Sequence, residues 1–253
     1  MEKELENLIE AIRTHPRADL YRTAWGNSST FDALPVVSRA DMAATPLDRR
    51  LYKEGRGMAK IVHTPISSFI SIWDFSDIGA EPFGIASSRP MSNFSDPREG
   101  IEKAMWCYEH NMVPLIGEQS PSVAILAARV CDIDSLITDS RSLSAFLPYL
   151  QERTTPLECI SVVDDDLSAA ALTSAAKFAK RVRLVLALPE IGAFAETTPD
   201  MYPTFSVLPN CILQEEDGLI LTKIAHLVTP IIRYRTGFTG LLGKNGARTF
   251  ALA

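Results

Sequence analysis

The stretch TPIIRYRTG occupies residues 229–237 and is the most informative run in the chain. Its β-branched start predicts a short strand over residues 229–232, and its closing glycine predicts a turn. Packing alone gives little reason for two arginines to flank a tyrosine directly after such a strand. The alternative interpretation is an edge strand that is closed by a glycine turn.

Short apolar runs alternate with helical patterns in the residues before this stretch. Strands are expected at residues 135–138, 157–163 and 183–188, and helices at residues 122–131, 140–151 and in an alanine-rich segment that ends near Lys180. This alternation is typical of parallel strands joined by right-handed crossovers. We therefore expect an α/β fold with a mostly parallel sheet flanked by helices. An active site is expected beyond the carboxyl ends of its strands.

The first hundred residues are predicted to hold helices and a bent pair of strands. The expected elements are helices at residues 2–13, 39–45 and 99–110, two short strands within residues 58–73 and a loop over most of residues 79–97. Ser38 is a plausible N-cap of the second helix, with Asp41 at capping-box spacing.

The pattern of the sequence changes after Gly192. Short strand-like runs at residues 211–214 and 218–224 are separated by a turn signal, which predicts hairpins or a small, distorted β-barrel-like part. The expected domains are therefore an α/β region over residues 1–192 and a β-rich region over residues 193–253.

Composition excludes several classes of protein. The 253 residues are 46% hydrophobic, which suffices for one large domain or two coupled lobes. The formal net charge of -6, without a basic cluster, makes nucleic acid a poor partner and is compatible with a cytoplasmic protein. A secretory signal and a membrane-spanning run are not expected. The cysteines are expected to be reduced core side chains, because they lack metal-ligand spacing: Cys107, Cys131, Cys159 and Cys211.

Residues 229–237 resemble the PxIRYRTGD segment of the adenylate-forming superfamily, in particular the branch of phenylacetate-CoA ligases and coenzyme F390 synthetases. Weaker similarities follow the same order along the chain: residues 34–41 resemble LPxxTKxDL, residues 189–192 resemble TExG, residues 218–222 resemble GELVLT and residues 246–249 resemble GRT. The resemblance extends from about Leu34 to Thr249. It implies the large-domain architecture of that superfamily.

The resemblance also implies a site in which a carboxylate attacks the α-phosphate of ATP. ATP or AMP, Mg²⁺ and CoA are implied as cofactors if adenylation survives, with Glu190 as the catalytic carboxylate and Mg²⁺ ligand. The alternative for Glu190 is an acidic residue at a strand end, since Pro189 stands where the family has Thr or Ser. The implied nucleotide-binding residues are Thr64, Ser67, Ser68, Tyr234, Arg235, Thr236 and Gly237.

The expected site departs from the family pattern in three places. The phosphate loop at residues 64–69 contains Pro65 and lacks glycine, so its backbone amides are poorly suited to wrap an anion. A buried turn is the alternative for this segment. Phe238 replaces the Asp that would bind the ribose hydroxyls, and the family's Lys-bearing domain is expected to be absent because the chain ends at Ala253.

Two histidines and one acidic run are weaker candidates. His63 and His226 are candidates for a substrate cleft, because a neutral imidazole serves as base or donor, but ordinary core or surface positions are the alternative. The acidic residues 164–166 are interpreted as the cap of the alanine-rich helix and not as a metal site.

The leading hypothesis is a divergent homologue, a pseudoenzyme with lost or weakened adenylation. Its partner would be an aryl or acyl carboxylate, an acyl thioester or another protein. One alternative is an active carboxylate-CoA ligase subunit that a separate protein completes. Another is a regulatory or assembly protein that uses the fold as a scaffold for a homodimer. Its contact surface is expected at residues 79–97, with the aromatic residues Trp73, Phe75, Phe83 and Phe94.

Overall fold

The computed structural model describes residues 2–26, 30–50, 57–63, 68–74, 88–117, 120–164, 173–224, 229–243 and 248–252. The chain divides into two compact units. Unit 1 comprises Met1–Asp77, Pro189–Phe194 and Ser206–Ala253, and unit 2 comprises Ile78–Leu188 and Ala195–Phe205. These bounds differ from the division expected at residue 192. The expected division into two domains stays a prediction.

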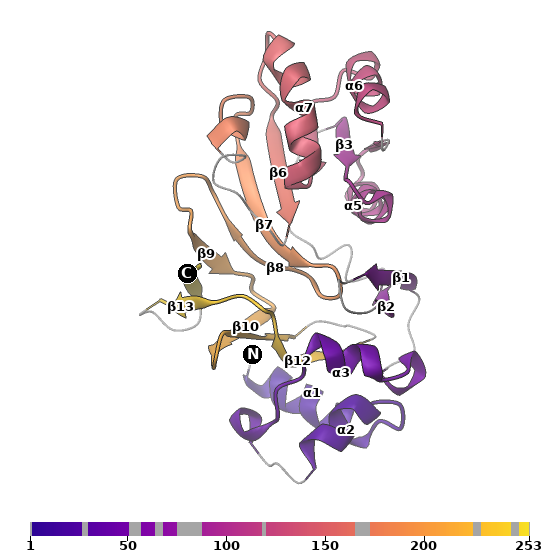
Figure 1. Cartoon of the computed structure of the whole chain (residues 1–253), viewed down its shortest axis with the longest axis vertical. Coiled ribbons are helices and arrows are strands. Elements are labelled where there is room, and N and C mark those ends of the chain that lie inside the picture. Colours follow the sequence, from indigo (N-terminus) through magenta and orange to yellow (C-terminus); the bar gives the residue numbers. More distant parts are fainter. Residues whose placement is uncertain are drawn as a thin grey trace. The chain divides into compact units, whose positions relative to one another are not determined.

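The five helices that hydrophobic periodicity predicts outside the alanine-rich segment agree with the structure to within two residues at each end, whereas α2 (Asp19–Trp25) was not predicted (Figure 1). The predicted helices are α1 (Glu2–Thr14), α3 (Arg39–Ala44), α5 (Pro97–Glu109), α6 (Pro121–Val130) and α7 (Ser140–Glu152), and the 3₁₀ turns are η1 (Phe31–Ala33) and η2 (Leu47–Arg49). The described part of the alanine-rich segment is helical only at residues 173–175.

The strands lie mainly in the second half of the chain. They are β1 (Gly57–His63), β2 (Ser68–Asp74), β3 (Pro90–Asn93), β4 (Leu115–Ile116), β5 (Ser135–Thr138), β6 (Cys159–Asp164), β7 (Val182–Leu188), β8 (Gly192–Thr197), β9 (Thr204–Val207), β10 (Cys211–Glu215), β11 (Leu219–Lys223), β12 (Ile231–Arg235), β13 (Gly240–Leu242) and β14 (Thr249–Leu252).

Unit 2 contains the parallel sheet that the sequence predicts. Its strands lie in the order β7-β6-β5-β3-β4, and each neighbouring pair is parallel. The helix α5 lies against β3 and α7 lies against β6 (Figure 1). The chain first passes from β3 to the edge strand β4 and then returns to the other side of β3 as β5. The connections therefore change direction between β3 and β5, where ligands of such sheets usually bind.

The strand β3 corrects the expectation of a loop over residues 79–97. All its residues are buried, because β4 and β5 pair with it on both sides. A strand that is buried throughout lacks the alternating pattern that marks strands in a sequence, and Pro90 is tolerated at its first position. Phe94, expected at an exposed contact surface, is only 6% exposed. Residues 79–87 and Phe75 lie outside the described residues.

Unit 1 combines α1, α2 and α3 with antiparallel strands. The strands β1 and β2 form a hairpin, as do β13 and β14, and β10, β11 and β12 form a sheet. Asp217 and Gly218 have positive φ angles in the turn from β10 to β11, which confirms the predicted turn there. The strand β12 begins two residues later than expected and contains the Arg-Tyr-Arg run itself.

Two further expectations concern the cysteines and the acidic run. Cys107, Cys159 and Cys211 are buried, but Cys131 is exposed because it follows the last turn of α6. The Asp164 carboxylate accepts a hydrogen bond from the Ser140 backbone N–H at 2.8 Å, at the first residue of α7, and Asp165 and Asp166 lie outside the described residues. Within the described ranges, no helix combines the length and the apolarity needed to cross a bilayer.

The predicted cap of α3 is confirmed and provides a test of local stability. The Ser38 hydroxyl accepts from the Asp41 backbone N–H at 3.2 Å, and the Asp41 carboxylate accepts from the Ser38 backbone N–H at 2.8 Å. We expect Ser38→Ala to lower the free energy of unfolding by about 1 kcal/mol in urea titrations. The control is Ser144→Ala on the exposed face of α7, which should change it by less than about 0.5 kcal/mol. Equal losses in both variants would contradict the capping role.

Candidate functional site

A buried cluster of three side chains lies at the expected position of Glu190. The Tyr234 hydroxyl donates a hydrogen bond to Glu190 Oε1 at 2.5 Å, and Arg39 Nε donates to the same oxygen at 2.8 Å. The Glu190 and Tyr234 side chains are fully buried, whereas the Arg39 side chain is 35% exposed. One carboxylate oxygen therefore receives a neutral donor and a cationic donor.

Backbone pairing brings Arg39 to this cluster. The Val37 N–H donates to the Arg233 carbonyl at 2.9 Å, and the Arg235 N–H donates to the Val37 carbonyl at 2.8 Å, which makes a parallel bridge to Tyr234. Arg39 follows two residues later, at the first position of α3. The sequence between the bridge and the capped helix thus fixes where the guanidinium lies.

The turn between β7 and β8 positions Glu190. It follows β7 directly, and Gly192 adopts a φ angle of 81° as β8 begins. Such a φ angle favours glycine because a Cβ atom would be strained there. Lys223 Nζ donates to the carbonyl of Ile191 at 3.0 Å, so the turn around Glu190 is fixed by a buried cation.

Tyr21 of α2 anchors the start of β12. Its hydroxyl donates to the Pro230 carbonyl at 2.5 Å and accepts from the Ile232 backbone N–H at 3.3 Å. The tyrosine thus satisfies the Pro230 carbonyl and the Ile232 N–H in the protein interior. Burial raises the pKa of Tyr21 above its ordinary value, so this tyrosine stays neutral in the folded chain.

The side chain of Arg233, the first arginine of the run, makes its contacts inside unit 1. Its side chain is nearly fully buried, forms an ion pair with Glu216 and donates to the carbonyl of Asp32 at 2.9 Å. Its backbone φ angle is 47°, and its N–H donates to the Thr222 hydroxyl at 2.9 Å. This irregular backbone turns the guanidinium toward neighbouring segments of unit 1.

The end of the run also forms hydrogen bonds to backbone carbonyls of unit 1. Arg235 donates to the carbonyl of Asp217 at 2.8 Å, and the Thr236 hydroxyl donates to the carbonyl of Leu219 at 2.7 Å. Gly237 has a φ angle of 85°, which explains a glycine at this turn. These contacts stabilise the strand and its turn. The hydroxyl hydrogen of Thr236 already forms a hydrogen bond within the protein.

The structure thus brings together two of the predicted site residues, Glu190 and Tyr234. His63 and Ser68 are paired at the closed end of the β1–β2 hairpin, so their backbones flank the expected phosphate loop. Thr64, Ser67 and His226 lie outside the described residues.

Arg39 was missed by reasoning from the sequence. The only signal is its position in residues 34–41, where it stands at the Lys of the LPxxTKxDL pattern that this stretch resembles.

Charge and burial act together on the protonation of the cluster. Burial raises the pKa of Tyr234 above its ordinary value, and the Glu190 carboxylate raises it further, while Arg39 opposes this shift. Burial lowers the pKa of Arg39, but the hydrogen bond and charge of Glu190 outweigh burial and raise it overall. The cluster therefore consists of a neutral tyrosine and a charged guanidinium against one carboxylate.

The described residues do not provide a donor set for Mg²⁺ at Glu190. A divalent cation of this kind needs several oxygen ligands, and the described ranges contain no group of three or more histidine, cysteine, aspartate or glutamate side chains that could hold one. Glu190 Oε1 already accepts from Arg39 and Tyr234. Its Oε2 atom is buried and has no hydrogen-bond partner among the described residues.

The expected ribose position also lacks an acceptor side chain. Phe238 is half-buried, and its ring centroid lies 6.0 Å from that of Phe194. An aromatic pair at this distance is stabilised by packing. Phe238 therefore extends the apolar core of unit 1 at a position where the resembling family places a carboxylate.

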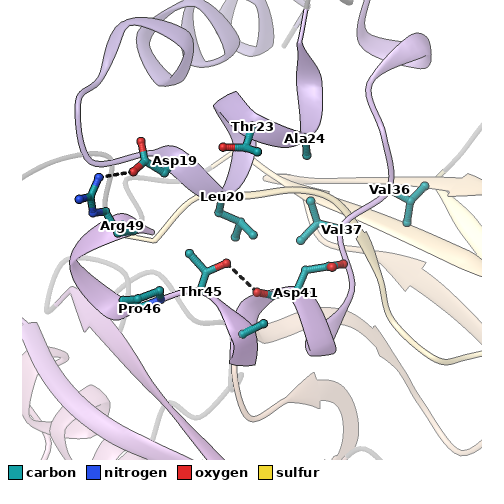
Figure 2. A pocket seen from close by; sticks show the side chains of 11 residues that line it. Asp19, Leu20, Thr23, Ala24, Val36, Val37, Asp41, Thr45, Pro46 and Arg49 are labelled. Carbon is teal, nitrogen blue, oxygen red and sulfur yellow. Dashed lines mark hydrogen bonds and ion pairs between the residues drawn. The ribbon is translucent and has the colours of Figure 1, made fainter.

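A pocket of about 480 Å³ lies between α2 and α3 in unit 1, and Figure 2 shows the side chains that line it. At its rim, Arg49 forms an ion pair with Asp19 at 2.5 Å, and the Thr45 hydroxyl donates to the Asp41 carbonyl at 2.8 Å. These four polar groups are therefore paired with one another, and the lining includes the apolar side chain of Leu20.

A second pocket, of about 450 Å³, lies in unit 2 beyond the carboxyl end of β3. Its lining combines Asn93, Phe94, Ser95, Pro121, Arg141, Ser142, Ala145 and Phe146. It therefore borders the first turns of α6 and α7, next to the place where the sheet connections change direction. This is the edge at which the sequence predicts an active site.

Comparison with known proteins supports the fold. No family model and no curated protein matches the chain in sequence. The structure is similar to 2-hydroxyisobutyryl-CoA ligase in complex with 2-HIB-AMP and CoA, with a TM-score of 0.73 and 10% identity over 99% of this chain and 72% of that chain. A complex of the same ligase with R3-HIB-AMP gives a TM-score of 0.73 and 12% identity, over 99% and 65% of the two chains.

A third similar structure is o-succinylbenzoate CoA synthetase from Bacillus subtilis in complex with AMP. It has a TM-score of 0.56 and 13% identity, over 78% of this chain and 48% of that chain. This chain thus spans less than half the length of that synthetase. At these identities the comparisons establish the fold alone, and this fold is the large-domain architecture of adenylate-forming CoA ligases.

The raised pKa of Tyr21 predicts a loss of stability in alkali. Above about pH 10 the unfolded chain releases the tyrosine proton while the folded chain keeps it, so unfolding is favoured by about 1.4 kcal/mol per pH unit for each such group. Tyr21→Phe should cost about 1 kcal/mol at neutral pH through its lost hydrogen bond, and should then lose stability less steeply above pH 10. Urea titrations between pH 7 and 11 measure both effects.

The control for this measurement is Tyr108→Phe, because the Tyr108 side chain is 73% exposed. It should leave both the neutral stability and the alkaline slope unchanged. An unchanged slope in Tyr21→Phe would show that Tyr21 ionises normally in the folded protein.

A double-mutant cycle tests the pair of Arg39 and Glu190. Arg39→Met should lower the free energy of unfolding by about 2 kcal/mol, because it leaves a buried carboxylate without a counter-charge. The cost is not larger because Arg39 is partly exposed and solvent screens its interaction with Glu190. With Glu190→Gln as the second change, we expect a coupling energy of about 1–2 kcal/mol in urea titrations at pH 7.

The matched control cycle uses Arg129 and Glu152, an ion pair whose side chains are 49% and 61% exposed. Its coupling energy should stay below about 1 kcal/mol. Additive losses in the Arg39 and Glu190 cycle would contradict an energetic role for the buried pair.

Proposed function

We propose that this chain is a divergent relative of the adenylate-forming CoA ligases in which ATP-dependent adenylation is lost or strongly weakened. Its ligand is an acyl or aryl carboxylate, or the corresponding thioester. Support comes from two independent sources: the similar fold of CoA ligases and the ordered motifs that end in residues 229–237.

One observation carries this proposal: the two side chains that would serve the nucleotide are buried and bound to each other. The Tyr234 hydroxyl and the Glu190 carboxylate share a hydrogen bond of 2.5 Å, and both side chains are fully buried. A nucleotide would reach them only if the Tyr234, Glu190 and Arg39 contacts opened. That opening costs free energy that a preorganised site does not lose.

Neighbouring positions weaken nucleotide binding further. The Thr236 hydroxyl donates to a backbone carbonyl, and the Phe238 side chain has no atom that accepts a hydrogen bond from a ribose hydroxyl. In enzymes that stabilise a charged transition state, one missing donor lowers the rate by about 10²–10³. Several such losses in one site are sufficient to suppress adenylation.

The pocket in unit 2 is the site we propose for the carboxylate or thioester. Its volume of about 450 Å³ lies within the usual range for small-molecule sites. The exposed Pro121 and the half-buried Ala145 offer apolar surface to an acyl or aryl group, and Arg141 is exposed at the pocket and offers a cation to a carboxylate. The position beyond the carboxyl end of β3 favours this pocket.

An active ligase subunit is the second candidate. The retained Glu190 and the Arg-Tyr-Arg run favour it, and the similar structures hold acyl-adenylates, AMP or CoA. In this case ATP, Mg²⁺ and CoA are the cofactors, and a separate protein supplies the groups that complete the site.

Exchange of pyrophosphate into ATP decides between the two candidates. With Mg²⁺, ATP and a panel of acyl and aryl carboxylates, we expect no exchange above background. We also expect Phe238→Asp not to restore exchange, because Tyr234 and Glu190 stay buried in that variant. Robust exchange by the unmodified chain would refute weakened adenylation, and rescue by Phe238→Asp alone would show that the buried pair is not the obstacle.

Thermal shift and calorimetry with the same carboxylates and their CoA thioesters test the proposed ligand class. At least one compound should raise the melting temperature, and Arg141→Met should weaken its binding about tenfold through the lost charge-assisted hydrogen bond. Arg129→Met, on the exposed face of α6 outside this pocket, is the control and should leave binding unchanged.

A further inference from the structure

The Glu190 carboxylate has its charge balanced from within the chain. Arg39 Nε lies 2.8 Å from Glu190 Oε1, and the Glu190 side chain is fully buried. A buried carboxylate without a counter-charge is strongly unfavourable, and this guanidinium provides the counter-charge. The same task would otherwise fall to a bound cation.

Only one oxygen of Glu190 is left for a metal ion. Its Oε2 atom is buried and unpartnered among the described residues, so the cluster offers at most one free oxygen. Mg²⁺ requires six oxygen ligands in near-octahedral geometry and retains several of its waters. Among the described residues, no group of three or more histidine, cysteine, aspartate or glutamate side chains is available to hold such an ion.

Charge repulsion adds to this mismatch. A divalent ion at Glu190 would lie within a few ångströms of the Arg39 guanidinium, which shares the same carboxylate. Like charges at such distances repel strongly in a partly buried environment, which weakens metal binding. The strengthened basicity of Arg39 agrees with a guanidinium that stays charged.

We infer that the guanidinium of Arg39 takes the place of a divalent metal ion at Glu190 and excludes such an ion from the cluster with Tyr234. The cluster then carries no net charge and offers no excess positive charge to a triphosphate. It is compatible with ligands of low charge, such as a thioester or a single carboxylate. For this ligand class the inference rests on the proposed function, whereas metal exclusion stands on the contacts of the three side chains.

Manganese binding followed by electron paramagnetic resonance tests metal exclusion without any assay of activity. Mn²⁺ is the probe, and its free signal is measured against increasing protein concentration. The wild-type chain should show no Mn²⁺ binding that depends on Glu190. Arg39→Gln keeps a hydrogen-bond donor beside Glu190 but removes the charge, and it should bind Mn²⁺ at least about tenfold more tightly than wild type.

Two further variants make the result specific. Arg39→Lys keeps the positive charge and should still exclude Mn²⁺, and Arg39→Gln combined with Glu190→Gln should lose the gain. Mn²⁺ binding by wild type that disappears in Glu190→Gln would overturn the inference. So would an Arg39→Gln variant that is folded by circular dichroism and gains no affinity. If Arg39→Gln fails to fold, Arg39→Met with the same readout decides.

This test separates the two proposals. Pyrophosphate exchange by wild type would refute weakened adenylation and leave metal exclusion intact. Mn²⁺ binding at Glu190 without exchange would refute metal exclusion and leave weakened adenylation intact.

Discussion

The burial of the Glu190 carboxylate is the constraint on which the arrangement of unit 1 depends. A charged group in the interior must be paired, and here the pairing comes from two segments far from it in the sequence. Arg39 lies 151 positions earlier and Tyr234 lies 44 positions later. Because both donate to one oxygen, the start of α3, the segment Pro189–Phe194 and the strand β12 are held together at a single atom.

The rest of the chain around this atom is organised to keep the donors in place. The parallel bridge between Val37 and Tyr234 sets the distance between α3 and β12, and Tyr21 satisfies the backbone on either side of Ile231. The Ser38 cap then starts α3 at Arg39. A one-residue shift of that start would turn the guanidinium away, because successive helical side chains differ in direction by about 100°.

Local patterns predicted the elements, and long-range pairing explains what they missed. Hydrophobic periodicity locates α1, α5 and α7, because each has one buried face and 3.6 residues per turn. It fails for β3, whose residues are all buried through pairing on both sides. The exposed Cys131 shows the same limit, since an apolar neighbourhood in sequence does not reveal where a helix ends.

The site shows this contrast more sharply. Glu190 and Tyr234 are identifiable from short motifs, but motifs do not report whether a side chain faces a cleft or another side chain. The backbone of Arg233 has a positive φ angle, which directs its side chain inward. A positive φ angle can be expected from the sequence at glycine but not at arginine. A fold similar to that of a CoA ligase at 10% identity is in line with a core that depends mainly on apolar volume. A polar site depends instead on a few specific contacts, such as those of Arg39 and Tyr234 with Glu190, and apolar patterning does not report these contacts.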